Sequence, residues 1–291
     1  MPNVRQLKRR IRSVENTSKI TKAMSMIAAS KMRRAQEAAV HGRPYADHMR
    51  VLHADLSAQL QFEDEENLHP LMQSREVKNV EIVLITPDRG LTGGLNSNIN
   101  REAAQFLVGQ SNNGGHTSVI AVGKKGRDFM VRSGQDVRAV FIDLPDRASL
   151  TDITPAAHLV TEAYAERRID AAFVVYAQFV NTTLQRPVVE PLLPVVPAEL
   201  RPQDAVGYIY EPNREDVLSD LLPRFVEMQL YHALLEGIAS EQSARMVAMR
   251  NATDSADEMV SDLTLVMNKV RQESITAELL DIVGGAAAVQ S

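Results

Sequence analysis

The sequence contains no cysteine and no tryptophan, and aromatic residues make up only 4% of its 291 residues. The absence of cysteine excludes disulfide bonds, thiolate metal ligands and a cysteine nucleophile. No run of about 18 apolar residues occurs, so no membrane-spanning helix is expected. The N-terminal stretch lacks the apolar segment of a secretory signal, so none is expected. A hydrophobic content of 44% with so few aromatics favours a core built from narrow contacts between helices.

Recognisable catalytic and metal-binding patterns are also missing. The seven histidines form neither an HExxH motif nor a convincing ligand pair, and no GxSxG or GxxxxGK[ST] motif occurs. The one glycine-rich turn, PDRGLTGGLN (87–96), follows an apolar run and precedes a helical pattern. Such a turn can bind phosphate through backbone N–H groups at a helix N-terminus. Its spacing differs from GxGxxG, so we favour a tight turn with a surface loop and keep phosphate binding as the alternative.

Positive charge is concentrated in the first 50 residues, although the whole chain carries a formal net charge of −5. That segment holds twelve lysines and arginines against three acidic residues and has a net charge of +9, which leaves −14 for the remainder. A basic helix on an acidic protein predicts an acidic partner, either another chain or another part of this one.

Apolar residues recur with a period near 3.5 at both ends of the chain, which is typical of coiled coils. At the N-terminal end this pattern spans residues 3–60, with an expected kink or short break at His41–Pro44. At the C-terminal end it runs from Asn213, which resembles a helix N-cap, to about residue 284. The simplest packing pairs the two long helices in antiparallel fashion.

Strand and helix patterns alternate in the middle of the chain, which predicts a mainly parallel α/β sheet. The expected strands are 80–86, 119–123, 137–142 and 171–179, with helices near 96–109, 124–133 and 151–167. Residues 183–197 carry four prolines and are expected to form an edge strand or an extended strap. A last strand is expected at 206–212.

We therefore expect an α/β protein with a long antiparallel α-helical coiled coil, in which a central Rossmann-like α/β domain is inserted between the paired terminal helices. The predicted domains are residues 1–76 (the N-terminal long helix and linker), 77–212 (the central α/β domain) and 213–291 (the C-terminal long helix).

Two long terminal segments, SVENTSKITKAMSMIAASKMRRAQ (13–36) and a region from SEQSARMVAMRNATDSADEMV to LTLVMNKVRQESITAELLDIVGGAAAV (240–289), closely resemble the gamma subunits of F-type ATP synthases. TPDRGLTGGLN (86–96) resembles a motif in the central domain of that family. The resemblance covers nearly the whole chain and is looser in the middle. It implies a central rotor shaft that couples proton-driven rotation of a c ring to conformational cycling of the catalytic beta subunits, without chemistry, a cofactor or nucleotide of its own.

The resemblance also implies partners and contact residues. The partners are alpha and beta subunits in a 3:3:1 complex, the epsilon subunit and the c ring, with no nucleic acid. The location implied is the cytoplasmic face of a bacterial plasma membrane, in preference to a mitochondrial or chloroplast equivalent, as a peripheral protein whose membrane contact is only through the c ring. Contacts with the alpha–beta ring are expected from Met24, Arg89, Thr92, Arg245, Arg271, Gln272, Thr276 and Glu278. Contacts with the c ring and epsilon are expected from Tyr208 and Tyr210. The small apolar tip GGAAAV (284–289) is expected to turn in an apolar collar of the ring.

Two other functions remain open from the residues alone. A nucleotide-binding α/β enzyme with coiled-coil arms would bind nucleotide as an isolated chain. A basic coiled-coil nucleic-acid adaptor would show strongly salt-dependent binding to duplex DNA. A basic amphipathic helix can also lie on a membrane, but its apolar face here lacks tryptophan and phenylalanine, which argues against that.

Overall fold

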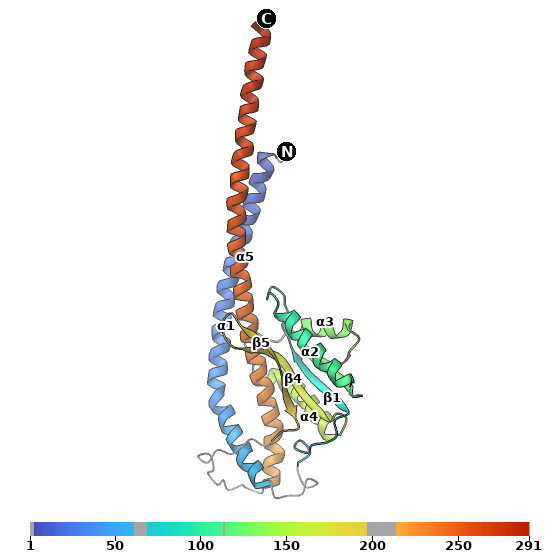
Figure 1. Ribbon diagram of the computed structural model, residues 1–291. Coiled ribbons are helices and arrows are strands. Elements are labelled where there is room, and N and C mark those ends of the chain that lie inside the picture. Colours follow the sequence, from blue (N-terminus) through green and yellow to red (C-terminus); the bar gives the residue numbers. More distant parts are fainter. Residues whose placement is uncertain (1–2, 61–68, 113, 197–213, 291) are drawn as a thin grey trace. The chain divides into compact units, whose positions relative to one another are not determined.

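The computed structural model describes residues 3–60, 69–112, 114–196 and 214–290 (Figure 1). Within these ranges the side chains of residues 39–60, 112, 214–215 and 284–290 are outside the description. The chain divides into two compact units, one formed by residues 1–28 with 246–291 and the other by residues 29–245. Two long helices, α1 (Val4–Leu60) and α5 (Arg214–Gln290), contribute to both units.

A five-stranded sheet forms the centre of the second unit, in the order β3-β2-β1-β4-β5. The strands are β1 (Asn79–Ile85), β2 (His116–Val122), β3 (Asp136–Phe141), β4 (Ala171–Phe179) and β5 (Gln185–Leu193). The first four are parallel, and β5 pairs with β4 in antiparallel fashion. The central strands are rich in valine and isoleucine, as expected for strands covered on both faces. The proline-rich segment therefore forms an edge strand, as its sequence predicted, because proline cannot donate to a further strand.

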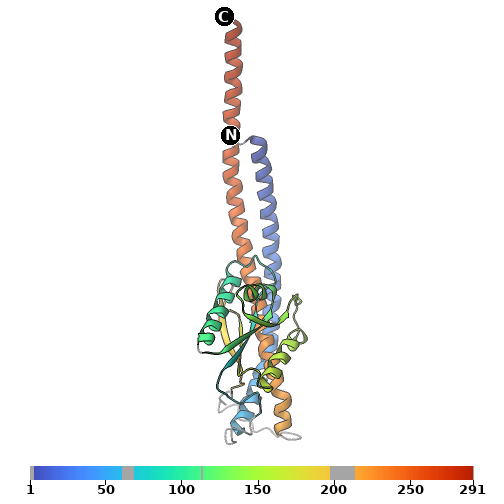
Figure 2. The same ribbon diagram turned by 90° about the vertical axis from the view of Figure 1, so that its right-hand side faces the viewer.

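Helices cover both faces of this sheet and create two cores. On one face, α2 (Leu95–Asn112) and α3 (Lys124–Arg132) pack against the sheet around Ile82, Leu84 and Val119. On the other face, α4 (Leu150–Ala165) and the first part of α5 pack around Val83, Ile85 and other buried side chains. Figure 2 shows the sheet between these two helical layers. The predicted strands and helices of residues 79–179 are thus confirmed, within a few residues at their ends.

Hydrogen bonds at the strand ends fix where α3 and α4 begin. Asp88 accepts from the backbone N–H of Lys124 at 2.8 Å and of Asp143 at 2.9 Å, which joins the turn after β1 to the start of α3. Ser149 and Asp152 form a reciprocal capping box at the start of α4. Gly123 has a φ of 109°, and a Cβ atom at this position would lie 1.8 Å from the Thr86 carbonyl oxygen. Only glycine permits this close approach of the two loops.

In the first unit, α1 and α5 lie side by side and antiparallel (Figures 1 and 2). Ser18 donates to the Asp257 carboxylate at 2.7 Å, and the hydroxyls of Thr21 and Thr253 are 2.6 Å apart. Ser25 donates to the carbonyl of Met246 at 3.3 Å. Along these three contacts the α1 residue rises from 18 to 25 while the α5 residue falls from 257 to 246. The two helices therefore run antiparallel in a fixed register. The expected pairing of the terminal helices is confirmed.

Of the kink or short break expected at His41–Pro44, the break does not occur, because α1 is helical without interruption from Val4 to Leu60. Proline at this position removes one helical hydrogen bond, but it does not end the helix. The expected strand 206–212 and the N-cap at Asn213 lie outside the described residues, as do Tyr208 and Tyr210. No described helix has the length and apolar character needed to cross a membrane.

Candidate interaction surfaces

The helix α5 continues far beyond the start of its partner α1 (Figure 1). The pairing of Ser18 with Asp257 and of Thr21 with Thr253 places Val4, the first residue of α1, near residue 270 of α5. From Arg271 to Val283 every side chain of α5 is exposed. The remaining part of α5, residues 271–290, comprises about 20 residues and is roughly 30 Å long. No described helix of the unit lies beside this segment.

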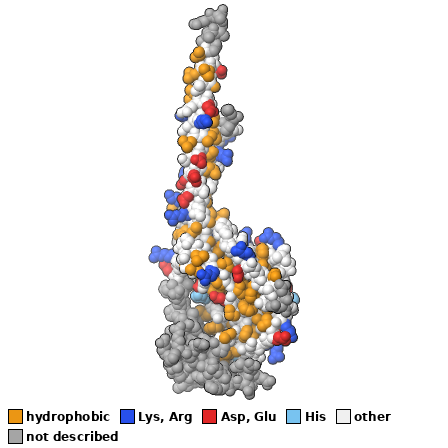
Figure 3. Space-filling view, in the orientation of Figure 1, with side chains coloured by type: hydrophobic (Ala, Val, Ile, Leu, Met, Phe, Trp, Pro, Cys, Tyr) orange, Lys and Arg blue, Asp and Glu red, His pale blue; other side chains and the backbone are white. Residues whose placement is uncertain are grey.

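Large apolar side chains are exposed along this unaccompanied segment. Ile275, Leu279, Leu280, Ile282 and Val283 are each 50–68% exposed. Figure 3 shows hydrophobic side chains along the upper part of the helix. A contiguous exposed apolar surface marks a site of contact with another molecule. The helical backbone extends through the GGAAAV tip to Gln290, although the side chains there are outside the description.

Four of the predicted contact residues belong to the same segment, and all four are exposed: Arg271, Gln272, Thr276 and Glu278. The Thr276 hydroxyl donates to the Gln272 carbonyl at 3.0 Å. Arg271 forms no ion pair with a described residue, so its planar guanidinium can pair with a carboxylate of another chain. The structure therefore places these residues on an accessible surface, and their contacts with a partner remain a prediction.

The cations in the first part of α1 are exposed and form no ion pairs with described residues of their unit. These seven cations are Arg5, Lys8, Arg9, Arg10, Arg12, Lys19 and Lys22. Further along α1, Lys31 does pair with Asp146 at 2.6 Å. The sequence left open whether the acidic partner lies in the same chain. For the first 28 residues, the described part of the chain forms no ion pair with these cations. Met24 is partly buried on the same segment.

A second group of predicted contact residues meets at the turn after β1. Arg245 on α5 donates to the Gly90 carbonyl at 3.3 Å and pairs with Glu241 at 2.7 Å. Arg89 and Leu91 are exposed beside this contact. Thr92 is only 2% exposed, and its hydroxyl has no partner among the described residues. Thr92 thus supports the turn from inside, and the side chains that another protein could reach are Arg89 and Leu91.

Burial controls the electrostatics of this turn. Glu241 has a raised pKa because burial disfavours its charged form, and the neighbouring Arg245 opposes that shift. The nearby carboxylates of Asp88 and Asp146 raise the pKa further. The sequence did not single out Glu241. The only available signal was its spacing of four residues from Arg245, which is common on helix surfaces.

The glycine-rich turn is a tight turn, and two of its residues have a left-handed backbone. Gly93 has a φ of 57°, and Leu91 also has a positive φ, of 63°. The N–H groups that follow bond within the turn, from Leu95 to the Thr92 carbonyl and from Asn98 to the Gly94 carbonyl. This agrees with the preferred sequence interpretation.

Comparison with known proteins shows the family of this chain. A family model described as ATP synthase matches residues 3–289. The ATP synthase gamma chain of Dehalococcoides mccartyi is 55% identical over 289 residues, which cover 99% of this chain and 100% of that protein. The chain belongs to the ATP synthase gamma chain family. The gamma chain of Herpetosiphon aurantiacus is also similar, with 48% identity over 295 residues and 99% coverage of each chain.

Solved structures agree with this gamma chain assignment. A chain of the Tetrahymena thermophila mitochondrial ATP synthase central stalk and c ring matches with a TM-score of 0.60 and 26% identity, covering 80% of this chain and 99% of that one. A chain of the Euglena gracilis mitochondrial enzyme matches with a TM-score of 0.67 over 98% of this chain and 94% of that one. Its identity of 19% makes this a likeness of fold. As a gamma chain, the protein is a stalk subunit of an ATP synthase.

Proposed function

We propose that this chain is the central rotor shaft of an F-type ATP synthase. It couples proton-driven rotation of the c ring to the conformational cycle of the catalytic beta subunits, and in reverse it couples ATP hydrolysis to proton pumping. The observation that carries this proposal is the end of α5, where exposed apolar and polar side chains occupy every face of a helix that has left its partner. A helix of this kind needs a surrounding protein to cover it.

The chemistry of that helix suits a surface that moves against its neighbours. Small side chains in GGAAAV (284–289) offer no deep projections that would lock the tip at one angle. A charged tip would lose hydration in an apolar collar, or form ion pairs that favour one orientation. Arg271, Gln272, Thr276 and Glu278 can make polar contacts with one beta conformation and break them for the next.

The partners in this proposal are three alpha and three beta subunits around the paired helices, with the epsilon subunit and the c ring beside the α/β domain. The exposed cations of α1 support an acidic partner surface. Tyr208 and Tyr210 are proposed contacts with the c ring and epsilon. The chain then acts as a non-catalytic, peripheral protein at the cytoplasmic face of a bacterial plasma membrane, because the similar gamma chains named above include bacterial ones.

Co-expression with alpha and beta subunits from the same source tests the proposal. We expect a complex with three alpha, three beta and one copy of this chain, measured by native mass spectrometry, and an ATPase activity that depends on the chain. A chain that purifies separately, or an ATPase that is indifferent to its presence, would contradict the rotor function.

A further inference from the structure

Two serines bond the helix α5 to the hairpin formed by β4 and β5. The Ser240 hydroxyl donates to the Ala177 carbonyl, near the end of β4, at 2.8 Å. One turn later, the Ser243 hydroxyl donates to the Thr182 carbonyl, in the loop between β4 and β5, at 2.7 Å. Both serine side chains are completely buried, so water does not compete for either bond.

A third hydrogen bond reaches α5 from its other side. Arg245 donates to the Gly90 carbonyl, in the turn after β1, at 3.3 Å. At 3.6 residues per helical turn, the side chains of Ser243 and Arg245 leave the helix in directions about 160° apart. The hairpin loop and the turn after β1 therefore contact α5 from nearly opposite sides. We call these three bonds, made by residues 240–245, the α5 clamp.

Each of the two loops in the α5 clamp is stiffened by its own hydrogen bonds. In the hairpin loop, the Asn181 side-chain oxygen accepts from the backbone N–H groups of Thr183 and Leu184, both at 2.9 Å. In the turn after β1, the Asp88 carboxylate bonds the turn to the start of α3. Because both loops are held in place, a force applied to one of them passes to α5 instead of bending the loop.

The α5 clamp lies where α5 leaves the unit that contains the sheet. Residue 245 is the last residue of α5 in that unit, and the same helix continues into the coiled-coil unit from residue 246. Earlier in α5, Leu222, Val226 and Leu230 are buried in the core beside the sheet. Apolar packing is not directional, whereas a hydrogen bond weakens steeply when its angle changes. The α5 clamp should therefore resist rotation of α5 about its own axis more strongly than this packing does.

We propose that the α5 clamp is the point at which torque passes between the α/β domain and α5, with Ser240 and Ser243 as positioning residues. This inference rests on the rotor function proposed above. A turning c ring rotates the α/β domain, and the clamp forces α5 to follow that rotation. When the clamp is weakened, more of each rotation step is stored as twist between the domain and the helix.

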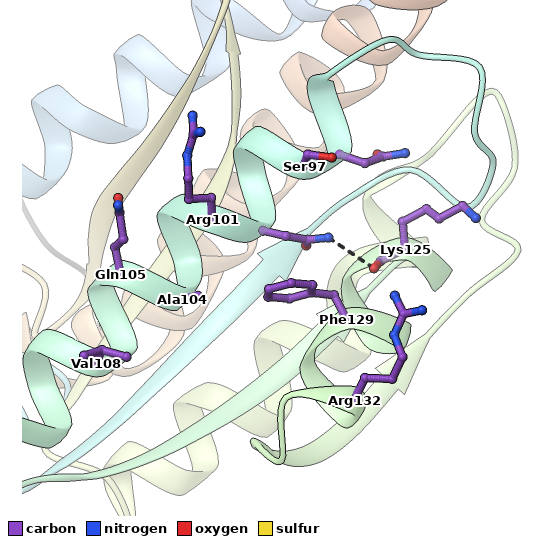
Figure 4. Close-up of a pocket in the computed structure, with 10 residues that line it drawn as sticks. Ser97, Arg101, Ala104, Gln105, Val108, Lys125, Phe129 and Arg132 are labelled. Atoms are coloured by element: carbon purple, nitrogen blue, oxygen red, sulfur yellow. Dashed lines mark hydrogen bonds between the residues drawn. The ribbon is translucent and has the colours of Figure 1, made fainter.

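The angular fluctuation of the α/β domain in a stalled complex of alpha, beta and this chain tests the proposal. The chain has no cysteine, so Val108→Cys supplies a single thiol for a bead on α2, where Val108 is 55% exposed (Figure 4). A ring of cysteine-free alpha and beta subunits is fixed to glass without nucleotide. We expect Ser240→Ala/Ser243→Ala to raise the variance of the bead angle at least twofold. Gln185→Ala, which removes a 3.4 Å bond to Ser243, should raise it less.

Ile99→Val is the control for a general loss of stability. It removes a methyl group from the buried side of α2, away from the α5 clamp, and should lower the melting temperature of the complex without changing the variance. An unchanged variance in Ser240→Ala/Ser243→Ala, or an equal rise in Ile99→Val, would overturn the proposal. Failure of the unaltered chain to assemble with alpha and beta is a different result, which would contradict the rotor function and the torque proposal together.

Discussion

Glu241 provides a pH-dependent contribution to stability at the scale of single residues. Its pKa in the folded chain is raised above the ordinary value of 4.5, mainly by burial. The folded state therefore binds this proton more tightly than the unfolded state does. The free energy of unfolding should fall as pH rises from about 4.5 through the raised pKa, and then level off.

Urea denaturation at a series of pH values checks this expectation. In Glu241→Gln the decrease over that pH interval should be smaller, because the titrating group is gone. An unchanged pH profile in the variant would show that another carboxyl group is responsible.

Arg138 and Glu81 form the ion pair that should matter most for the stability of the sheet. Glu81 is fully buried on β1, and Arg138 on β3 donates to it from Nε at 2.6 Å. Ser118, on the strand between them, donates to the same carboxylate at 3.1 Å. Arg138→Met should cost about 3–5 kcal/mol, because it leaves a buried carboxylate without its cation. Arg127→Met, which breaks the half-exposed pair with Asp128, should cost about 1 kcal/mol or less in the same urea titration.

At the scale of the helices, a small polar layer fixes the register of α1 against α5. The Thr21 hydroxyl lies within bonding distance of the Ser18 carbonyl, and the Thr253 hydroxyl within bonding distance of the Met249 carbonyl. The two hydroxyls also contact each other at 2.6 Å. Each hydroxyl has one hydrogen to donate, but these contacts would need three donated hydrogens. One threonine therefore donates to the other threonine instead of to the carbonyl of its own helix.

Replacing the two threonines separately and together measures the coupling between the helices. Thr21→Val should cost about 1 kcal/mol, and the double variant Thr21→Val/Thr253→Val should cost less than the sum of the two single changes. Thermal unfolding of the three variants gives the coupling energy. Strict additivity would mean that the two hydroxyls do not interact.

The exposed end of α5 carries a prediction about turnover. Gln272→Leu should lower the steady-state ATPase of the assembled complex, because it removes a side chain proposed to bond to one beta conformation at a time. Ser274→Ala is the control, since the Ser274 hydroxyl already bonds to the Val270 carbonyl of its own helix. Wild-type activity in Gln272→Leu would count against a switching contact.

Local sequence patterns were sufficient to predict most of the secondary structure. Apolar periodicity located the strands and helices, and prolines such as Pro187 and Pro191 placed β5 at the sheet edge. Pro44 shows the limit of this reasoning. Its ring removes one helical hydrogen bond, yet α1 continues through it over 57 residues. The Glu81–Arg138 pair joins residues far apart in sequence, so no local pattern indicated it. The glycine-rich turn was interpreted correctly, but the burial of Thr92 depends on packing that only the fold supplies.

At the scale of the whole molecule, coupling is the property that distinguishes a rotor from a scaffold. Met24→Lys should reduce the number of protons pumped per ATP hydrolysed, because a new cation on α1 can pair with acidic residues of the beta subunit. Met24→Leu keeps the apolar side chain and should leave the ratio unchanged. The measurement is ATP-driven proton uptake in vesicles that contain the complete complex. An unchanged ratio in Met24→Lys would contradict the proposed contact.

The pairing of Ser18 with Asp257 joins residues 239 positions apart. At a synthesis rate of about 5–20 residues per second, α1 leaves the ribosome roughly ten to fifty seconds before the part of α5 that covers it. During that interval its apolar stripe has no intramolecular partner. Its dense positive charge should keep such nascent chains apart by repulsion and so lower the tendency of the unfinished chain to aggregate.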